Sequence, residues 1–360
     1  MSPDKPKLNQ EAVEKFGEKV WGNIGSTMTT AICCLGEQLG LYQALAEIGA
    51  VTSKELAVHT GLHERWLREW LQQQACAGIV AYEGNGRFYL TPEAIEVLVN
   101  EDNLWFAGGG LTFVMALALN APNLKNCFQS GLGLPYDTLG FEGAVGLERM
   151  GGAWKRQKLV SEILPMMDGV VEKLERGALV ADIGCGVGTA TMVMAKTFPK
   201  SEFHGYDTSQ HALVEARQRM ADSGLSNLFW HDPSEENLPD DGRFDFITTF
   251  DVVHDTENPA GLIAAIYKGL KPNGTWFLED MAGKSSFEEN LSDHPDPASF
   301  YAFSVLVCMP SGLSEPGGAG LGTLGFHEDI ARQMTNEAGF TRFRKLDVED
   351  VFKNYYEVRP

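Results

Sequence analysis

The feature that most constrains the fold is a regular alternation of strand-like and helix-like segments that begins after Gly177. Short apolar or alternating runs indicate seven strands: LVADI, EFHGYD, NLFWHD, FDFITTF, TWFLED, RFRKLD and NYYEVRP. Helical periodicity fills four of the intervals, at residues 189–197, 209–222, 257–270 and 327–338. Strand–helix alternation favours a parallel sheet covered by helices on both faces. The sequence therefore predicts an α/β fold for this part of the chain.

The N-terminal part shows the order of a winged-helix domain instead. Apolar residues recur at helical spacing over residues 26–48. Thr52 and Glu55 form a capping pattern before the segment ELAVHT, and residues 63–77 make a further amphipathic helix. The stretch GIVAYEGNGRFYL then alternates around Gly84-Asn85-Gly86, which is typical of a two-stranded ribbon. Three helices followed by a ribbon indicate a mostly helical winged-helix domain.

We therefore divide the 360 residues into three parts. Residues 1–100 form the winged-helix and dimerisation domain, residues 101–176 a helical connector that roofs the pocket, and residues 177–360 the α/β domain. Within the last part, residues 281–326 combine prolines and glycines with the apolar run FYAFSVLVCM, which indicates a lid-like insertion. The first ten residues are expected to be a loose arm.

Charge and cysteine usage narrow the choice of partners. The chain holds 49 acidic and 29 basic residues, a formal net charge of −20, which disfavours nucleic acid and anionic membranes. Its six cysteines lack C-x-x-C spacing, and no histidine pattern resembles a metal site, so we expect neither disulfides nor a metal. The N-terminus has no apolar run behind a basic one, and no stretch is long enough to span a bilayer. We expect a cytoplasmic protein.

A glycine-rich turn follows the first strand of the α/β part and opens a helix. Gly184-x-Gly186-x-Gly188 allows a sharp turn and the close approach of a ligand. A dinucleotide fingerprint would have its third glycine one residue later, at Thr189. The turn has no lysine or arginine, which suits a ligand without phosphates.

Acids at successive strand ends complete the predicted ligand site. Asp182 lies in the first strand, Asp207 ends the second and can accept both ribose hydroxyls, and Asp232 ends the third and can accept an adenine amino group. Ligands of open α/β sheets lie across the carboxyl ends of adjacent strands, so these acids would contact successive parts of one adenosine. The predicted cofactor-binding set is Asp182, Gly184, Gly186, Gly188, Asp207, Thr208, Asp232, Pro233 and Phe250.

At these residues the chain resembles the class I methyltransferases that use S-adenosylmethionine (SAM), over about residues 150–360. The resemblance implies a Rossmann-like seven-stranded sheet with an antiparallel last strand, SAM as cofactor and a small-molecule methyl acceptor. The segments FDVVHD, LVCMPSGLSEPGGAGLG, EAGFTRFRKL and EVRP are similar to a family of winged-helix methyltransferases best known from mycobacteria. Related enzymes are dimers, and we expect a homodimer through the apolar helix around Cys33, Cys34, Leu35 and Leu39.

The resemblance also points to a candidate base. Val252-Val253-His254-Asp255 is similar to a segment of plant-type O-methyltransferases in which the histidine is the general base, steadied by a glutamate that Glu279 or Asp280 would match. We assign His254 and Glu279 as catalytic, and Trp154, Asp251 and Tyr301 as substrate contacts. The lysine and tryptophan of the plant segment are Phe250 and Asp251 here, so a packing role for His254 stays open.

Other functions remain as alternatives. A small thiol acceptor would need little help from a base. Magnesium held by Asp251 with Glu279 or Asp280 would match the catechol-type enzymes. The winged helix allows a DNA-binding regulator with a SAM-sensing domain, but acidic residues outnumber basic ones over residues 50–100. A dehydrogenase would explain Asp207, although the glycine spacing argues against it.

Overall fold

The structure is a computed structural model that describes residues 8–360. The expected loose arm therefore lies largely outside the described residues, but Asn9 and Gln10 already cap and begin a helix. The chain divides into two compact units between Met115 and Ala116. This boundary falls inside helix α6 (Gly108–Asn120), whereas the sequence analysis divides the chain at residues 100 and 176. Residues 116–176 belong to the same unit as the sheet.

The first unit has the predicted order of helices and ribbon. Thr52 Oγ1 accepts from Glu55 N–H, and a side-chain oxygen of Glu55 accepts from Thr52 N–H. The predicted capping box is therefore present. The strands form one three-stranded sheet in the order β1-β3-β2. Leu45, Leu56 and Leu71 are fully buried between the helices and this sheet. The elements are α1 (Gln10–Gln38), α2 (Leu41–Ile48), β1 (Val51–Thr52), α3 (Ser53–Thr60), α4 (Glu64–Cys76), β2 (Ala81–Gly84), β3 (Arg87–Tyr89) and α5 (Pro92–Leu98).

The prediction of one helix over residues 26–48 is wrong in two respects. The helix α1 begins at Gln10, where the Asn9 side chain accepts from a backbone N–H group of the first turn. It ends at Gln38, because Gly40 takes a left-handed conformation with φ of 66° and starts α2. The apolar periodicity runs across this break, so a sequence pattern does not reveal it.

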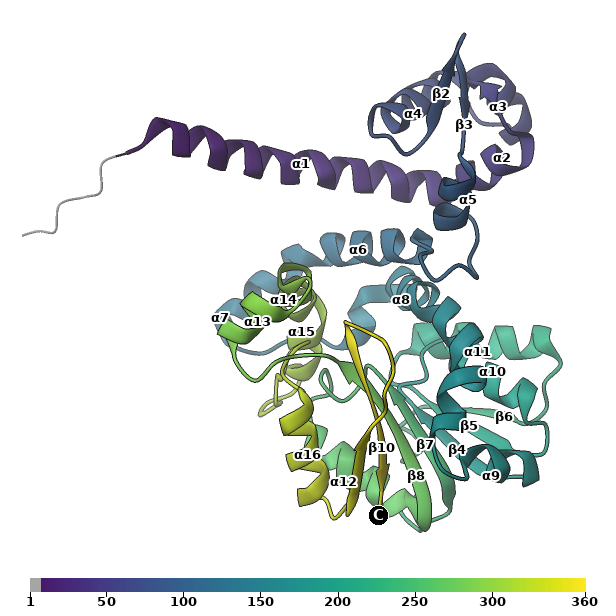
Figure 1. The fold of residues 1–360 in the computed structure, drawn as a ribbon, viewed down its shortest axis with the longest axis vertical. Coiled ribbons are helices and arrows are strands. Elements are labelled where there is room, and N and C mark those ends of the chain that lie inside the picture. Colours follow the sequence, from purple (N-terminus) through teal and green to yellow (C-terminus); the bar gives the residue numbers. More distant parts are fainter. Residues whose placement is uncertain (1–7) are drawn as a thin grey trace, which may run out of the picture. The chain divides into compact units, whose positions relative to one another are not determined.

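Helix α1 also carries a row of exposed apolar side chains. Phe16, Trp21 and Met28 are 68%, 72% and 62% exposed, whereas Cys33 and Cys34 are buried inside the unit. Figure 1 shows the N-terminal half of α1 extending away from α2, α3 and α4. Most of this apolar surface therefore lies N-terminal to Cys33 and Cys34, around which we expect the dimer contact. Its members are Val13, Phe16, Val20, Trp21, Ile24, Met28 and Leu35, followed by Leu39 directly after the helix.

The second unit holds a seven-stranded sheet in the order β6-β5-β4-β7-β8-β10-β9. Strand β10 pairs antiparallel with both β8 and β9, and the other pairs are parallel, which confirms the predicted fold class. A dinucleotide-binding sheet has no such inserted strand in its usual order. The strands are β4 (Leu179–Ile183), β5 (Glu202–Tyr206), β6 (Leu228–His231), β7 (Phe244–Phe250), β8 (Leu270–Met281), β9 (Arg342–Lys345) and β10 (Lys353–Arg359).

Helical segments surround this sheet. The short helices η1 (Ala121–Leu124), α7 (Lys125–Ser130) and η2 (Tyr136–Leu139) precede α8 (Gly140–Trp154), which continues as the π-helical η3 (Lys155–Ile163) and then η4 (Leu164–Met166). The strands then alternate with further helices, as the sequence predicts. These are α9 (Val170–Arg176), α10 (Thr189–Thr197), α11 (Gln210–Ser223), α12 (Pro259–Gly269) and α16 (Glu328–Glu337).

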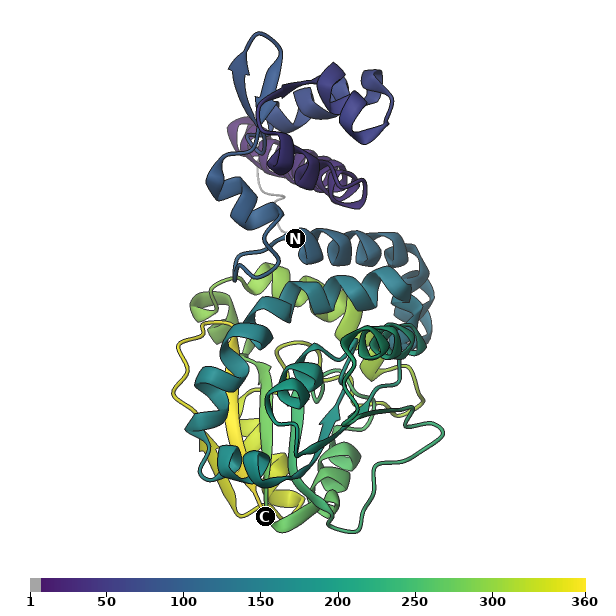
Figure 2. The same cartoon turned by 90° about the vertical axis from the view of Figure 1, so that its right-hand side faces the viewer.

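Both faces of the sheet are buried because successive strand residues point to opposite sides. Val180, Phe246 and Phe277 pack with residues of η3, α9 and α10 in one apolar cluster. Their neighbours Ala181, Ile247 and Trp276 pack with residues of α12 and α16 in the other. Figures 1 and 2 show the sheet between these two sets of helices. The sheet is thereby held rigidly, and the loops at its edge can position a site.

The insertion at residues 281–326 contains more helix than its prolines and glycines suggest. It forms α13 (Phe287–Asp293), α14 (Pro297–Phe303), the π-helical η5 (Ser304–Cys308) and α15 (Met309–Gly312). Helix α15 is hydrogen-bonded to the segment before η2. Gly133 N–H donates to Leu313 O, directly after α15, at 2.7 Å, and Leu134 N–H donates to Pro310 O at 2.9 Å. That it acts as a lid stays a prediction. No helix within residues 8–360 is long and apolar enough to cross a membrane.

Candidate active site

The predicted site residues meet at one edge of the large sheet because neighbouring parallel strands end together. The register pairs Ile183 with Tyr206, and the glycine turn and Asp207 follow these two residues directly. Phe250 pairs with Glu279 on the other side of the turn. The cofactor turn, the ribose acid and the segment with His254 therefore belong to adjacent strands of one sheet.

The three glycines of the turn all have left-handed backbone conformations, with φ of 69°, 57° and 85° at Gly184, Gly186 and Gly188. A Cβ atom at Gly184 would lie 2.2 Å from Val252 Cγ2, and one at Gly188 would lie 2.3 Å from the ring of Trp230. Only glycine satisfies both the backbone and the space at these positions.

Asp207 binds the turn directly. Its Oδ2 accepts from Gly186 N–H at 2.7 Å, and its Oδ1 accepts from Ser209 N–H at 2.8 Å. Burial raises its pKa above the ordinary value although both backbone bonds act against this. Two oxygens with lone pairs left over can still accept ribose hydroxyls. Thr208 is exposed beside it.

Asp182 supports the turn from inside. It is fully buried, and its two oxygens accept from Thr191 Oγ1 at 2.5 Å and Thr248 Oγ1 at 2.8 Å. Burial raises its pKa to about 6. Asp182 thereby fixes β4 to α10 and β7, and its contact with the cofactor remains a prediction.

Asp232 lies at the end of β6, as the adenine assignment requires. It accepts from Ser234 and from Gln210 Nε2, the latter at 2.5 Å, and the Ser234 bonds lower its pKa. Pro233 follows it and is half-buried. The contacts of both residues with an adenine remain predictions.

Glu279 does not contact the candidate base. Its carboxylate is paired with Lys353, which also binds Asp251 Oδ2 at 2.5 Å. Burial raises the pKa of Glu279 to about 7, and the charge of Lys353 acts against this shift. Asp251, expected to touch substrate, is held here with a left-handed φ of 57°. The Lys353 ammonium group therefore already bridges Asp251 and Glu279, two of the acids considered as magnesium ligands.

The partner of His254 is Asp280 instead. Nδ1 of the imidazole lies 2.6 Å from Asp280 Oδ1, and the two side chains are 3% and 1% exposed. Met281 N–H also donates to this oxygen at 2.8 Å. Burial would lower the pKa of His254, but the charge of Asp280 and the nearby Cys308 outweigh it and raise the pKa well above its ordinary value.

Cys308 and Asp255 complete a cluster around this histidine that sequence reasoning missed. Donor atoms of His254, Asp255 and Cys308 lie within 4.8 Å of one another, and Thr323 Oγ1 lies 2.9 Å from Cys308 Sγ. Burial raises the pKa of Asp255 to about 7. Because these three possible metal ligands lie so close together, the expected absence of a metal remains a prediction.

The remaining predicted contacts are less central. The ring of Trp154 stacks on Tyr355 at 5.3 Å in the core of the unit, and Phe250 is buried with Lys155 Nζ 5.4 Å from its ring centroid. Tyr301 contacts Phe287 inside the insertion, with ring centroids 5.9 Å apart. A substrate role for Trp154 and Tyr301 remains a prediction.

Tyr136 is a further residue that the sequence did not suggest. Burial, followed by the charges of Asp255 and Asp207, raises its pKa well above the ordinary value. Tyr136 is therefore affected by two acids, Asp207 of the cofactor loop and Asp255 next to His254. A lone tyrosine in a glycine-rich segment carries no sequence signal for this position.

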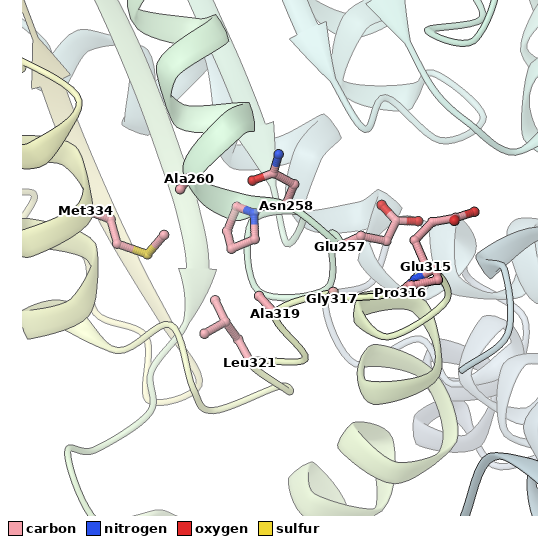
Figure 3. A pocket seen from close by; sticks show the side chains of 11 residues that line it. Glu257, Asn258, Ala260, Glu315, Pro316, Gly317, Ala319, Leu321 and Met334 are labelled. Carbon is pink, nitrogen blue, oxygen red and sulfur yellow. The ribbon is translucent and has the colours of Figure 1, made fainter. Parts of the chain in front are cut away.

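A surface pocket of about 490 Å³ lies outside this constellation. Figure 3 shows its lining, which comes from the loop before α12, from residues 315–321 and from Met334 of α16. None of the predicted catalytic, cofactor or substrate residues lines it. The site at the strand ends is therefore the better candidate on chemical grounds.

Comparison with known proteins agrees with this geometry. A family model described as "Methyltransferase domain" matches residues 181–276, and one described as "Rv2258c-like winged HTH domain" matches residues 27–99. The ubiquinone biosynthesis O-methyltransferase of Methylococcus capsulatus is 32% identical over 107 residues, which are 29% of this chain and 44% of that protein. The chain spans less than half the length of the first curated relatives that it matches.

Solved structures share the fold over almost the whole chain. The mitomycin 7-O-methyltransferase MmcR has a TM-score of 0.70 at 18% identity and covers 98% of this chain and 99% of its own. Human N-acetylserotonin methyltransferase, solved in complex with SAM, has a TM-score of 0.64 at 15% identity with 99% of each chain covered. At these identities the likeness shows the fold alone.

Domain content and fold together define a class I methyltransferase domain joined to a winged-helix domain. Residues 181–276 thus carry a methyltransferase domain of the kind that uses S-adenosylmethionine.

The first prediction concerns Asp207. Asp207→Ala removes the acceptor of the Gly186 and Ser209 amides and of the ribose hydroxyls, so SAM binding should weaken by about 2–4 kcal/mol. Calorimetric titration measures this, with Asp207→Asn to separate charge from shape. The control is Asp240→Ala, which changes an exposed loop acid. Wild-type affinity in Asp207→Ala would contradict the site.

The second prediction concerns Lys353. Lys353→Met leaves the buried Glu279 without its cation, which should cost roughly 3–5 kcal/mol of unfolding free energy. The folded-state pKa of Glu279 lies above its unfolded value, so its charged form is the costly one and the cost grows as pH rises through 7. Denaturant unfolding of variant and wild type at pH 6 and pH 8 checks this. A deficit independent of pH would contradict the pairing.

Proposed function

We propose that this protein transfers the methyl group of SAM to a hydroxyl oxygen of a small molecule, with His254 as general base. The observation that carries the proposal is the buried His254–Asp280 pair, 2.6 Å apart, on the strands beside the glycine turn. Supporting it, the mitomycin 7-O-methyltransferase and the ubiquinone biosynthesis O-methyltransferase are named for oxygen acceptors.

The residues present suit SAM as the cofactor. Glycine at positions 184 and 188 lets the turn close against Val252 and Trp230, and the acids Asp207 and Glu148 border the same turn at Gly186. A cationic ligand without phosphates matches a turn of this kind. When bound, SAM supplies an electrophilic methyl group on a sulfonium.

The protein contributes position and proton transfer. Methyl transfer is an in-line displacement, so holding the acceptor oxygen in line accounts for most of the rate. Neutral His254 would take the acceptor's proton on Nε2, because Nδ1 is bound to Asp280. Asp280 then stabilises the imidazolium that forms, as the third group of a triad does.

A thiol acceptor is the second candidate, and the raised pKa of His254 favours it specifically. A histidine that is protonated near neutral pH does not accept a proton from an alcohol. It does stabilise a neighbouring thiolate, as imidazolium groups do for reactive cysteines.

We do not propose that the winged-helix unit binds nucleic acid. The arginines of α4 are paired within the helix, Arg65 with Glu69 and Arg68 with Glu64, both at 2.6 Å. They are therefore unavailable as a basic footprint for DNA.

The six free cysteines support the cytoplasm as the compartment.

The third prediction separates the two acceptors. With a hydroxyl acceptor, kcat/KM should rise with pH through an apparent pKa above the ~6.5 of ordinary histidine, since only neutral imidazole is a base. Asp280→Asn removes the charge that raises this pKa, so the profile should move to lower pH. His254→Ala should lose about 10²–10⁴-fold in kcat with SAM affinity unchanged.

For a thiol acceptor the profile should follow the pKa of the substrate thiol, and His254→Ala should move that profile to higher pH with little loss of turnover above it. Full turnover of His254→Ala on an alcohol would end the general-base proposal. An Asp280→Asn profile identical to wild type would show that the pair does not set the base's pKa.

We also propose that the protein is a homodimer in which α1 pairs with a second copy. The exposed apolar row on α1, including Phe16, Trp21 and Met28, is too extended to be left in water without cost. A second copy of the same chain offers the same apolar row, which is what a twofold interface requires.

The fourth prediction follows. Trp21→Asp should dissociate the dimer, because a charge replaces a 72% exposed indole in the apolar row. Light scattering at micromolar concentration measures the mass. Val58→Asp, at an 87% exposed position of α3, is the matched control and should leave the mass unchanged. A monomeric wild type would contradict the proposal.

A further inference from the structure

A buried carboxylate borders the glycine turn and has no role in the chemistry described so far. Glu148 of α8 is 6% exposed, and a Cβ atom on Gly186 would lie 3.2 Å from its Oε2. The carboxylate therefore approaches the turn at the one glycine whose N–H group binds Asp207. It reaches the cofactor site from a helix far earlier in the chain.

The carboxylate is ionised and incompletely satisfied. Oε2 accepts from Lys155 Nζ at 3.1 Å, whereas the buried Oε1 has no hydrogen-bond partner. Burial would raise the pKa of Glu148, but Lys155 outweighs it and the pKa lies below its ordinary value. A buried, charged oxygen without a partner is costly, so a donor that arrives with a ligand would relieve that cost.

We propose that Glu148 binds the α-ammonium group of the methionyl part of SAM, an inference that rests on the proposed SAM site. SAM has two cationic centres, the ammonium and the sulfonium. The sulfonium loses its charge as the methyl group leaves, so a carboxylate against it would stabilise the reactant more than the transition state. The ammonium keeps its charge throughout and donates hydrogen bonds, which matches the unpaired oxygen.

The neighbouring charges agree with this assignment. Asp207 and Asp182 lie at the same turn as Glu148, and the Lys155 ammonium group is paired with Glu148. Lys155 is itself directed to Oε2 and lies over the ring of Phe250, so it leaves Oε1 free for a ligand. A turn bordered by several carboxylates, whose neighbouring lysine is already paired, suits a ligand whose amino-acid end carries a positive ammonium group.

The test compares three ligands by calorimetric titration. SAM and S-adenosylhomocysteine both carry the ammonium, whereas 5′-methylthioadenosine keeps the adenosine and sulfur but lacks the amino acid. Glu148→Gln should weaken SAM and S-adenosylhomocysteine equally, by roughly 10- to 100-fold, and leave 5′-methylthioadenosine unchanged. Glu142→Gln, an exposed change on the same helix, should alter none of them.

A second variant guards against an effect of folding. Glu148→Gln combined with Lys155→Gln leaves no buried ion unpaired and should show the same selective loss. Weakening of SAM alone would place the carboxylate at the sulfonium, and equal weakening of all three ligands would make Glu148 a support of the turn; either result overturns the proposal. These outcomes are read from binding, so they are distinct from a failure of hydroxyl methylation, which only turnover reports.

Discussion

The site depends on the hydrogen bonds by which Asp207 joins two adjacent strand ends. One oxygen holds the Gly186 amide and the other holds the Ser209 amide, at 2.7 and 2.8 Å. The glycine turn after β4 is thereby fixed to the loop after β5. Asp182 secures the same turn from below through two threonine hydroxyls. A ligand that crosses these strand ends meets a rigid surface.

Charge pairing controls the other half of the site. Lys353 of β10 holds Glu279 and Asp251, which leaves Asp280 to His254. The two acids of β8 are adjacent in sequence, so they point to opposite sides of the strand. One therefore meets the antiparallel strand's lysine and the other meets the histidine. The inserted antiparallel strand thus decides which carboxylate tunes the candidate base.

The sequence predicted the sheet because strand residues face two apolar layers. Runs such as LVADI and FDFITTF are apolar on both sides, and their spacing gave all seven strands. The break at Gly40 was missed because the apolar period continues through it. The sequence points to Glu279 as the acid beside His254, whereas Asp280 is the one paired with it, because Lys353 holds Glu279. Glu148 and Tyr136 could not be found, because they come from helical segments distant from the turn and match no motif.

We propose that a small-molecule hydroxyl receives the methyl group at the edge where His254 and the glycine turn meet. The most direct measurement is the release of S-adenosylhomocysteine from SAM across a panel of small hydroxyl, thiol and amine compounds. We expect release with hydroxyl compounds. Release with amines only, or with thiols only, would contradict it.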